Sequence, residues 1–216
     1  LACVGELLWD VFPEGEHLGG APANLAAHAA RLGNEVWLLS AVGEDARGRE
    51  ARVQLEHLGV RTSLVSVISE LPTGVVAVAR DLQGEPSYEI RRPAAYDRLV
   101  LTPAARELLS GGLHWVAFGT LLFTNPETRS YLDLVLAASP GVRRFYDVNL
   151  REGHYSWPLV EDLIHAADVL KLNEAEAHWV QGAATIAAPN LESFCRQVAP
   201  AFQLDTVCIT RGETGC

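Results

Sequence analysis

Strand-like apolar runs alternate with helix-like segments along most of this chain, and that alternation limits the possible folds more than any other feature of the sequence. Repeated strand–helix–strand order predicts an α/β protein with a mainly parallel, doubly wound sheet. A length of 216 residues suffices for one such domain over 1–216. The apolar runs occupy residues 3–8, 36–42, 64–68, 114–119, 142–148, 169–172 and 206–210, and the helical segments occupy 21–32, 47–58, 103–109, 126–138, 158–167, 174–181 and 191–198.

Residues 73–92 depart from this pattern. Two extended runs, 73–80 and 87–92, are joined by a turn-rich connector at 81–86 with no helix between them. Because antiparallel strands need only a short connection, this stretch predicts a hairpin outside the main sheet. It would form a flap or a small second sheet, which either covers a site or contacts another copy of the chain.

Charge and residue spacing disfavour several classes of function. The chain has 17 Lys and Arg against 27 Asp and Glu, a net charge of −10, which opposes non-specific binding to nucleic acid. No apolar run reaches the roughly 20 residues needed to cross a bilayer, so we expect a cytoplasmic protein without membrane partners. The four cysteines and seven histidines lack C-x-x-C, H-x-x-x-H and H-x-H spacings, and G-x-S-x-G is absent, which disfavours zinc enzymes and hydrolase triads.

Polar residues and glycines follow the predicted strands, where ligands bind in doubly wound sheets. Asp10 comes after the first strand, and its carboxylate could accept hydrogen bonds from vicinal hydroxyls; a solvated loop residue is the alternative. Gly19 and Gly20 precede a helix rich in small residues, which offers free N–H groups to oxygen atoms. Asn24 lies in the first turn of that helix with both a donor and an acceptor, as a sugar hydroxyl requires.

Later strand ends carry charged residues and further glycines. Arg151 leaves the strand at 142–148 and could bind a phosphate, or form an ordinary surface ion pair. Asn173 and Glu176 fit a capping box, and Glu176 is also compatible with Mg²⁺ bound through water. Residues 210–215 form a strand end and glycine turn that would allow backbone contact with a nucleotide. Each of these signals is weak alone.

Together and in order, these segments resemble the PfkB carbohydrate kinase family, which includes ribokinases and fructokinases. The first signature is present with its spacing intact, and three shorter motifs follow it along the chain. The matching residues are Gly19, Gly20, Asn24, Ala26, Gly33 and Gly43 for the first signature, Gly43, Asp45 and Gly48 for G-x-D-x-x-G, Asn173 and Glu176 for N-x-x-E, and Thr210, Gly212 and Gly215 for T-x-G-x-x-G.

The resemblance implies a ribokinase-like three-layer α/β/α fold with a small β lid, formed by segments at about 10–20 and 73–92. It implies transfer of the ATP γ-phosphoryl group to a sugar hydroxyl with Mg²⁺. By the same resemblance, Arg151 lies near the transferred phosphate and Glu176 serves Mg²⁺ indirectly. The sugar would be held by Asp10, Gly19, Gly20, Asn24 and, from the lid, Arg91; the nucleotide would be held by Lys171, Asn173, Thr210, Gly212 and Gly215.

The amino-acid sequences of residues 88–97 and 147–151 are most similar to those of fructokinases, so fructose is the expected sugar. Ribokinase, 2-keto-3-deoxygluconate kinase and an inactive sugar-binding relative stay open as alternatives. A nicotinamide-dependent dehydrogenase is disfavoured because the G-x-G-x-x-G fingerprint is absent. Pairing of two lids in a homodimer is a further expectation, since an open hairpin has unpaired edges.

The family's catalytic base is an Asp in a G-A-G-D motif, which the resemblance places after residues 210–215 and beyond Cys216. These 216 residues contain no such motif, so no residue of the chain is assigned as the base. We expect the sequence to be a fragment of a complete kinase.

Overall fold

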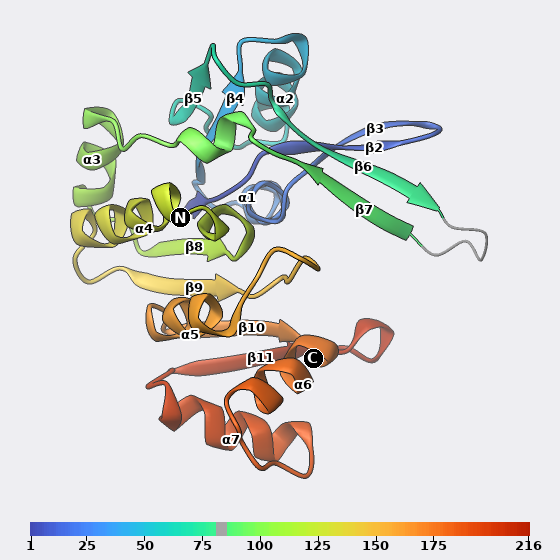
Figure 1. The fold of residues 1–216 in the computed structure, drawn as a ribbon. Helices are drawn as coiled ribbons and strands as arrows, with labels where there is room; N and C mark the ends of the chain where they lie inside the picture. The colour runs from blue at the N-terminus through green and yellow to red at the C-terminus, as the bar shows by residue number, and fades with distance from the viewer. Residues whose placement is uncertain (81–85) are drawn as a thin grey trace.

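The structure is a computed structural model of residues 1–216; it describes all of them except 81–85, and the side chains outside 79–87. Its main feature is a seven-stranded sheet of order β11-β10-β9-β8-β1-β4-β5, in which every described pair is parallel (Figure 1). The predicted parallel α/β sheet is therefore confirmed. The strands are β1 (Ala2–Val4), β4 (Trp37–Gly43), β5 (Val65–Ile68), β8 (Trp115–Gly119), β9 (Arg143–Asp147), β10 (Val169–Asn173) and β11 (Thr206–Thr210).

The order of these strands reverses direction between β1 and β8. From β1 the chain proceeds to β4 and β5 on one side, and then returns to add β8, β9, β10 and β11 on the other. Ligands bind at such a switch point in doubly wound sheets, beyond the carboxyl ends of the strands. We therefore expect a ligand site among the residues that follow β1 and β8.

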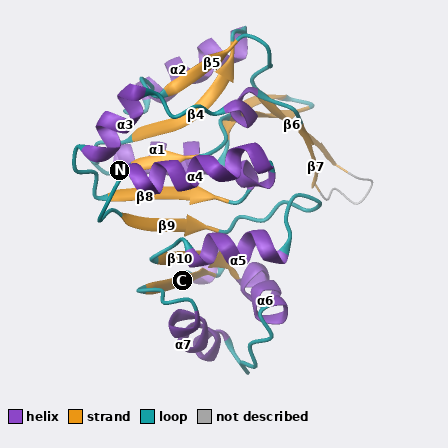
Figure 2. Ribbon diagram, turned by 60° about the vertical axis from the view of Figure 1, so that its left-hand side comes forward, coloured by secondary structure: helices purple, strands orange, loops and turns teal. Residues whose placement is uncertain are grey.

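Helices cover both faces of the sheet, which gives three layers. Because strand side chains alternate between faces, Ala2 and Val4 join one buried apolar cluster and Cys3 joins the other. Figure 2 shows α4 and α5 in front of the strands, where their apolar faces belong to the larger cluster. The helices are α1 (Ala21–Arg31), α2 (Ala46–His57), α3 (Pro103–Ser110), α4 (Pro126–Ala138), α5 (Trp157–His165), α6 (Glu174–Ala183) and α7 (Leu191–Ala201), with short 3₁₀ turns η1 (Ala95–Arg98), η2 (Leu121–Thr124) and η3 (Gly212–Thr214).

A second sheet of four strands projects from the first (Figure 1). Its order is β3-β2-β6-β7, with antiparallel pairs β2–β3 and β6–β7 and a parallel pair β2–β6 at its centre. The hairpin expected within 73–92 is thus observed, although most of its predicted connector falls on residues 81–85, outside the described residues. The strands are β2 (Leu8–Phe12), β3 (Gly15–Gly19), β6 (Gly74–Arg80) and β7 (Pro86–Arg91).

The start of the chain differs from the prediction. The apolar run at 3–8 does not form a single strand. Strand β1 ends at Val4, and Leu8 begins β2, which belongs to the second sheet. Asp10 therefore lies within a paired strand, opposite His17 of β3, rather than in a loop. Hydrophobicity alone could not reveal this change of sheet, because both parts of the run are buried.

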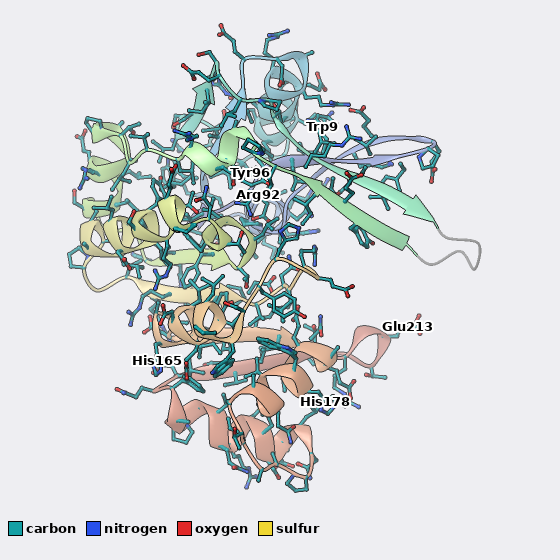
Figure 3. All side chains as sticks on the ribbon, viewed as in Figure 1. Trp9, Arg92, Tyr96, His165, His178 and Glu213 are labelled. Carbon is teal, nitrogen blue, oxygen red and sulfur yellow. The ribbon has the colours of Figure 1, made fainter. Side chains whose placement is uncertain are left out.

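Polar contacts hold both roots of the β6–β7 hairpin against the main domain. Asp45, the N-cap of α2, accepts hydrogen bonds from the Thr73 backbone N–H (2.8 Å) and hydroxyl (2.7 Å), immediately before β6. After β7, the Arg92 guanidinium pairs with buried Asp97 and contacts Thr124. Figure 3 shows Arg92 and Tyr96 where the two sheets meet. These contacts fix the direction in which the second sheet leaves the domain.

None of the helices in the described part of the chain combines the length and apolarity required to cross a membrane.

Candidate active site

A cavity of about 1030 Å³ lies between the second sheet and the carboxyl ends of the main strands, at the switch point of the topology. Five structural units meet there: the segment between β1 and β2, strands of the second sheet, the first turn of α1, the start of η2, and the end of β9 with the loop that follows it. The lining residues include Glu6, Leu8, Asp10, Phe12, Gly20, Asn24, Val76, Tyr88, Ile90, Leu121, Asp147, Asn149 and Arg151. We call this space the cleft.

Asp10 reaches the cleft from β2 and is half-buried. Burial raises the pKa of its carboxyl group, and the nearby Arg151 and His17 oppose that rise. Gly19 does not line the cleft, but it makes room for this carboxylate: a Cβ at Gly19 would lie 2.3 Å from Asp10 Oδ2. A side chain at position 19 would therefore displace the Asp10 carboxylate from its present place.

Gly20 is the N-cap of α1 and lines the cleft beside Asn24. Its φ of +104° falls in the region that favours glycine, and a Cβ there would meet the Glu6 carbonyl oxygen at 2.3 Å. The Gly20 carbonyl accepts the Asn24 backbone N–H at 2.9 Å, while the Asn24 side chain is exposed toward the cleft. The structure thus brings Asp10, Gly20 and Asn24 together, as the sequence predicts.

Glu6 is a cleft residue that the sequence analysis missed. It follows β1 and is only 4% exposed, yet it lines the cleft. Its Oε1 accepts the Ala21 backbone N–H at 3.1 Å, at the start of α1. Burial raises the pKa of Glu6 to about 7, and backbone hydrogen bonds and Arg151 counteract part of that rise. The only sequence signal was a lone acidic residue inside an apolar run.

The loop after β9 supplies the charged side of the cleft. Asp147, the last residue of β9, accepts a hydrogen bond from Lys171 Nζ of β10 at 2.9 Å. Arg151 is exposed; it donates to Asn149 Oδ1 (2.9 Å) and to the Leu150 carbonyl (3.1 Å). Arg151 is therefore held by its own loop with its charge unpaired by any carboxylate among the described residues.

Glu176 and Asn173 form the predicted capping box at the start of α6. Asn173 Oδ1 accepts the Glu176 N–H, and Glu176 Oε2 accepts the Asn173 N–H, both at 2.8 Å. The other oxygen, Oε1, accepts the Leu150 N–H of the β9–α5 loop at 2.9 Å. Glu176 is 6% exposed. It therefore fastens the loop that carries Arg151 to the end of β10.

The glycine turn after β11 lies on the same edge of the main sheet as the cleft. Thr210 is in register with Asn173 across the parallel β10–β11 pair, and its hydroxyl donates to the Leu172 carbonyl at 3.3 Å. Gly212 and Gly215 have φ of +59° and +89° around η3, in the exposed loop where Figure 3 labels Glu213. The predicted nucleotide contacts thus form a row beside the cleft and are not part of its lining; they are Lys171, Asn173, Thr210, Gly212 and Gly215.

Cys216 follows this glycine turn and is the residue beyond which the resemblance places the catalytic Asp. Its thiol is free and exposed, and it is not among the residues that line the cleft. The position of the base beyond Cys216 stays a prediction, because it concerns sequence outside these 216 residues.

One predicted sugar contact is not brought to the cleft. Arg91 is exposed and lines a separate pocket with Asp45, Arg47 and Thr73. Successive side chains of a strand point to opposite faces, so Tyr88 and Ile90 face the cleft from β7 while Arg91 faces away. The structure therefore places Arg91 on the face of β7 opposite to the cleft.

Comparison with known proteins identifies the family of this chain. Residues 5–216 match the family described as pfkB family carbohydrate kinase. The chain belongs to this family. The resemblance inferred from the glycine, Asn and Glu motifs is thereby confirmed, and the cleft lies in a carbohydrate kinase fold.

Relatives in the pfkB family are similar over nearly the whole chain. The fructokinase of Salmonella typhimurium is 27% identical over 225 residues, which cover 98% of this chain and 71% of the relative. The solved fructokinase of Vibrio cholerae O395 in its apo form is 26% identical, with a TM-score of 0.80 over 98% of this chain and 74% of that chain. The sugar kinase PH1459 of Pyrococcus horikoshii, solved in complex with ATP, is 26% identical, with a TM-score of 0.74 over 85% of this chain and 66% of that chain.

A magnesium ion is implied by the pfkB resemblance, and the residues present fit it only through water. No group of three or more His, Cys, Asp or Glu side chains suited to a metal exists among residues 1–80 and 86–216. Each Glu176 oxygen already accepts a backbone N–H, which leaves one lone pair per oxygen for a metal-bound water. Mg²⁺ commonly keeps several waters and takes its other ligands from phosphates, so this donor set is compatible with it.

Proposed function

We propose that the protein containing this chain is an ATP-dependent sugar kinase that phosphorylates fructose. The observation that carries the proposal is the convergence of Asp10, Gly20 and Asn24 in one cleft, with Arg151 at its border. The glycine turn of the T-x-G-x-x-G motif lies along the same sheet edge. A sugar in the cleft and a triphosphate beside it would therefore be neighbours.

The sugar is held by groups whose chemistry matches hydroxyls. The Asp10 carboxylate accepts hydrogen bonds, and the Asn24 amide both donates and accepts. Leu8, Val76 and Ile90 provide apolar walls against which the carbon face of a sugar packs. Such a site orients the reacting hydroxyl while the rest of the sugar is excluded from water, and positioning of this kind accounts for much of phosphoryl-transfer catalysis.

The triphosphate is placed along the row from Lys171 to Gly215. Within the turn the N–H groups of Arg211, Thr214 and Gly215 donate to its own carbonyls, so the N–H groups of Gly212 and Glu213 are the donors offered to phosphate oxygens, and Gly212 places no side chain in the way. Arg151, which is free of any carboxylate partner in the described residues, stabilises negative charge on the transferred group. When bound, Mg²⁺ would screen the phosphate charge, with Glu176 contacting it through water. Replacing Glu176 by Gln is then expected to raise the Mg²⁺ concentration needed for half-maximal rate; a fall in Tm alone would leave only the capping role.

The relatives support this choice of substrates. PH1459 has been solved with ATP, and the Vibrio cholerae O395 fructokinase has also been solved with fructose, ADP and a calcium ion. We place the general base in the G-A-G-D motif of the family, which these 216 residues do not contain. Activity is therefore tested on the full-length gene product.

The test is an ATP-consumption assay across fructose, ribose, 2-keto-3-deoxygluconate and a nucleoside. The proposal expects kcat/KM for fructose to exceed that for each other compound at least tenfold. Preference for ribose or 2-keto-3-deoxygluconate would keep the kinase but replace the substrate. No turnover with any of them, together with fructose binding by calorimetry, would identify an inactive sugar-binding relative instead.

Pairing of two second sheets in a homodimer stays a prediction. The outer edges of β3 and β7 pair with no other strand among the described residues, and such edges are available for strand addition. Sedimentation of the full-length protein, compared between wild type and Glu16→Pro in β3, would test it.

A further inference from the structure

The most unusual polar group outside the predicted site is the carboxyl of Glu6. One of its oxygens is anchored, since Oε1 accepts the Ala21 N–H at the start of α1. The other, Oε2, is buried and has no hydrogen-bond partner among the described residues. Buried oxygen atoms are nearly always hydrogen-bonded, so an orphaned one in the lining of a cleft requires an explanation.

The anchoring contact gives this carboxyl a fixed direction. Oε1 is held by α1, and the Gly20 backbone packs directly on Glu6, with room for no Cβ between them. The carboxyl therefore cannot turn its second oxygen toward another protein group without breaking the first contact. The remaining donors lie in the cleft itself, a water in the free protein or a hydroxyl of a bound ligand that displaces it, and the same helix turn presents Asn24 to that ligand.

We propose that Glu6 is a sugar-binding residue, with Oε2 accepting a hydrogen bond from a hydroxyl of the sugar that Asp10 and Asn24 also hold. This inference rests on the proposed function, because it takes a sugar to be the occupant of the cleft. Glu6 thereby adds a third polar contact, at the floor of the cleft, to the two that the motifs identify. A hydroxyl there satisfies the buried oxygen, whereas an analogue without it leaves the carboxylate unpaired, which is how such groups discriminate between sugars.

The ionisation of Glu6 gives the proposal a measurable signature. Its pKa is raised by burial to about 7, so that both protonation states are populated near neutral pH. Accepting a hydrogen bond from a hydroxyl favours the ionised state of Glu6, and sugar binding should therefore strengthen as pH rises through that value. The charged and titratable groups that face Glu6 and its cleft are Asp10 on β2, His17 on β3, Tyr88 on β7, Tyr96 on η1, and Asp147, Lys171, Arg151 and Glu152 around the β9 end.

The decisive variant is Glu6→Gln in the full-length protein. Glutamine keeps an oxygen for the Ala21 N–H, so α1 stays anchored, but it replaces Oε2 by an amide nitrogen that only donates. Fructose is titrated calorimetrically without ATP between pH 6 and pH 8. We expect the wild-type Kd to fall about tenfold over this range, as a group with a pKa near 7 ionises. We expect Glu6→Gln to bind about tenfold more weakly at pH 8 and to show no pH dependence.

Controls separate a sugar contact from a structural role. Asp168→Asn changes a carboxylate that also accepts a backbone N–H, at 2.7 Å from Arg144 N, but at the opposite end of the strands. It should leave the fructose Kd and its pH dependence unchanged. In steady-state assays, Glu6→Gln should raise KM for fructose while KM for ATP stays within about twofold. A lower Tm with unchanged fructose binding would show that Glu6 only anchors α1.

The outcomes distinguish this inference from the function on which it rests. Wild-type protein that neither binds nor phosphorylates any sugar of the panel overturns both. Where the panel instead identifies ribose or 2-keto-3-deoxygluconate, the same titration uses that sugar. Wild-type binding with a pH dependence that survives in Glu6→Gln overturns the Glu6 assignment alone and transfers the dependence to Asp10.

Discussion

Two buried glutamates lie at the same edge of the main sheet, one below the cleft and one at the junction of β10 and α6. Both accept backbone N–H groups from a helix start, Glu6 from Ala21 and Glu176 from Asn173. Glu176 also accepts the Leu150 N–H, so both of its oxygens are satisfied. Glu6 Oε2 has no partner among the described residues.

The two glutamates differ in whether the fold alone accounts for their carboxylate contacts. A carboxylate with both oxygens used by the backbone is explained by the fold, because it compensates N–H groups at a helix start and in a loop. A carboxylate that keeps one buried oxygen unpaired costs stability in the free protein. The fold does not explain that cost, whereas binding of a hydroxylated ligand does.

The largest effect should follow removal of the satisfied glutamate. Glu176→Ala leaves the Leu150 and Asn173 N–H groups without their acceptor, so we expect the free energy of unfolding to fall by about 4 kcal/mol. Urea denaturation measures it. A loss of unfolding free energy below about 1 kcal/mol would mean that water replaces both contacts and that Glu176 does not hold the β9–α5 loop against α6.

The buried carboxyl of Glu6 should make the free energy of unfolding depend on pH. The pKa of Glu6 is raised in the folded state from 4.5 to about 7, so the folded protein binds this proton more strongly than the unfolded chain. The protonated carboxyl of Glu6 therefore contributes about 3 kcal/mol to the free energy of unfolding below about pH 4.5. This contribution is lost as pH rises to about 7. The difference in unfolding free energy between wild type and Glu6→Gln should change by that amount between pH 4.5 and pH 8; a constant difference would contradict the burial of a titrating carboxyl.

Removal of a cleft side chain that the motifs predict should affect binding more than folding. We expect Asp10→Ala to raise the KM for fructose at least tenfold, about 1.4 kcal/mol, because the hydroxyl partner loses a charged acceptor. Asn24→Ala should act in the same direction. Steady-state kinetics of the full-length protein provide the measurement, and unchanged fructose kinetics in both variants would contradict the placement of the sugar.

The smallest effect is expected on the far face of the second sheet. Arg91 and Tyr88 lie on one strand but line different pockets. Arg91→Ala should therefore change the KM for fructose by less than about twofold, whereas Tyr88→Ala should raise it. A larger rise in the KM for fructose in Arg91→Ala than in Tyr88→Ala would mean that β7 presents its other face to the sugar.

The main sheet could be predicted from the sequence because its signals are local. Strand–helix alternation predicts parallel strands, and two elements, α4 and β11, have the predicted bounds. Glycine and Asn motifs identify the α1 and α6 starts for the same reason, since capping and close backbone approach act over a few residues.

Features that depend on pairing between distant segments could not be predicted. The change of sheet between Val4 and Leu8 is decided by the partners of β2, namely β3 and β6, rather than by hydrophobicity. Which face of β7 meets the cleft depends on one residue of register, and the observed register turns Arg91 away from the cleft. Glu6 carries no motif, and only the approach of α1 shows that its carboxyl is half-satisfied.

The most direct test of the account is a crystal structure of the full-length protein with fructose and a non-hydrolysable ATP analogue. We expect fructose between Asp10 and Asn24 with a hydroxyl within hydrogen-bond distance of Glu6 Oε2, and phosphates over the turn at 210–215. Fructose bound beside Arg91, or phosphates at the opposite end of the strands near Asp168, would contradict it.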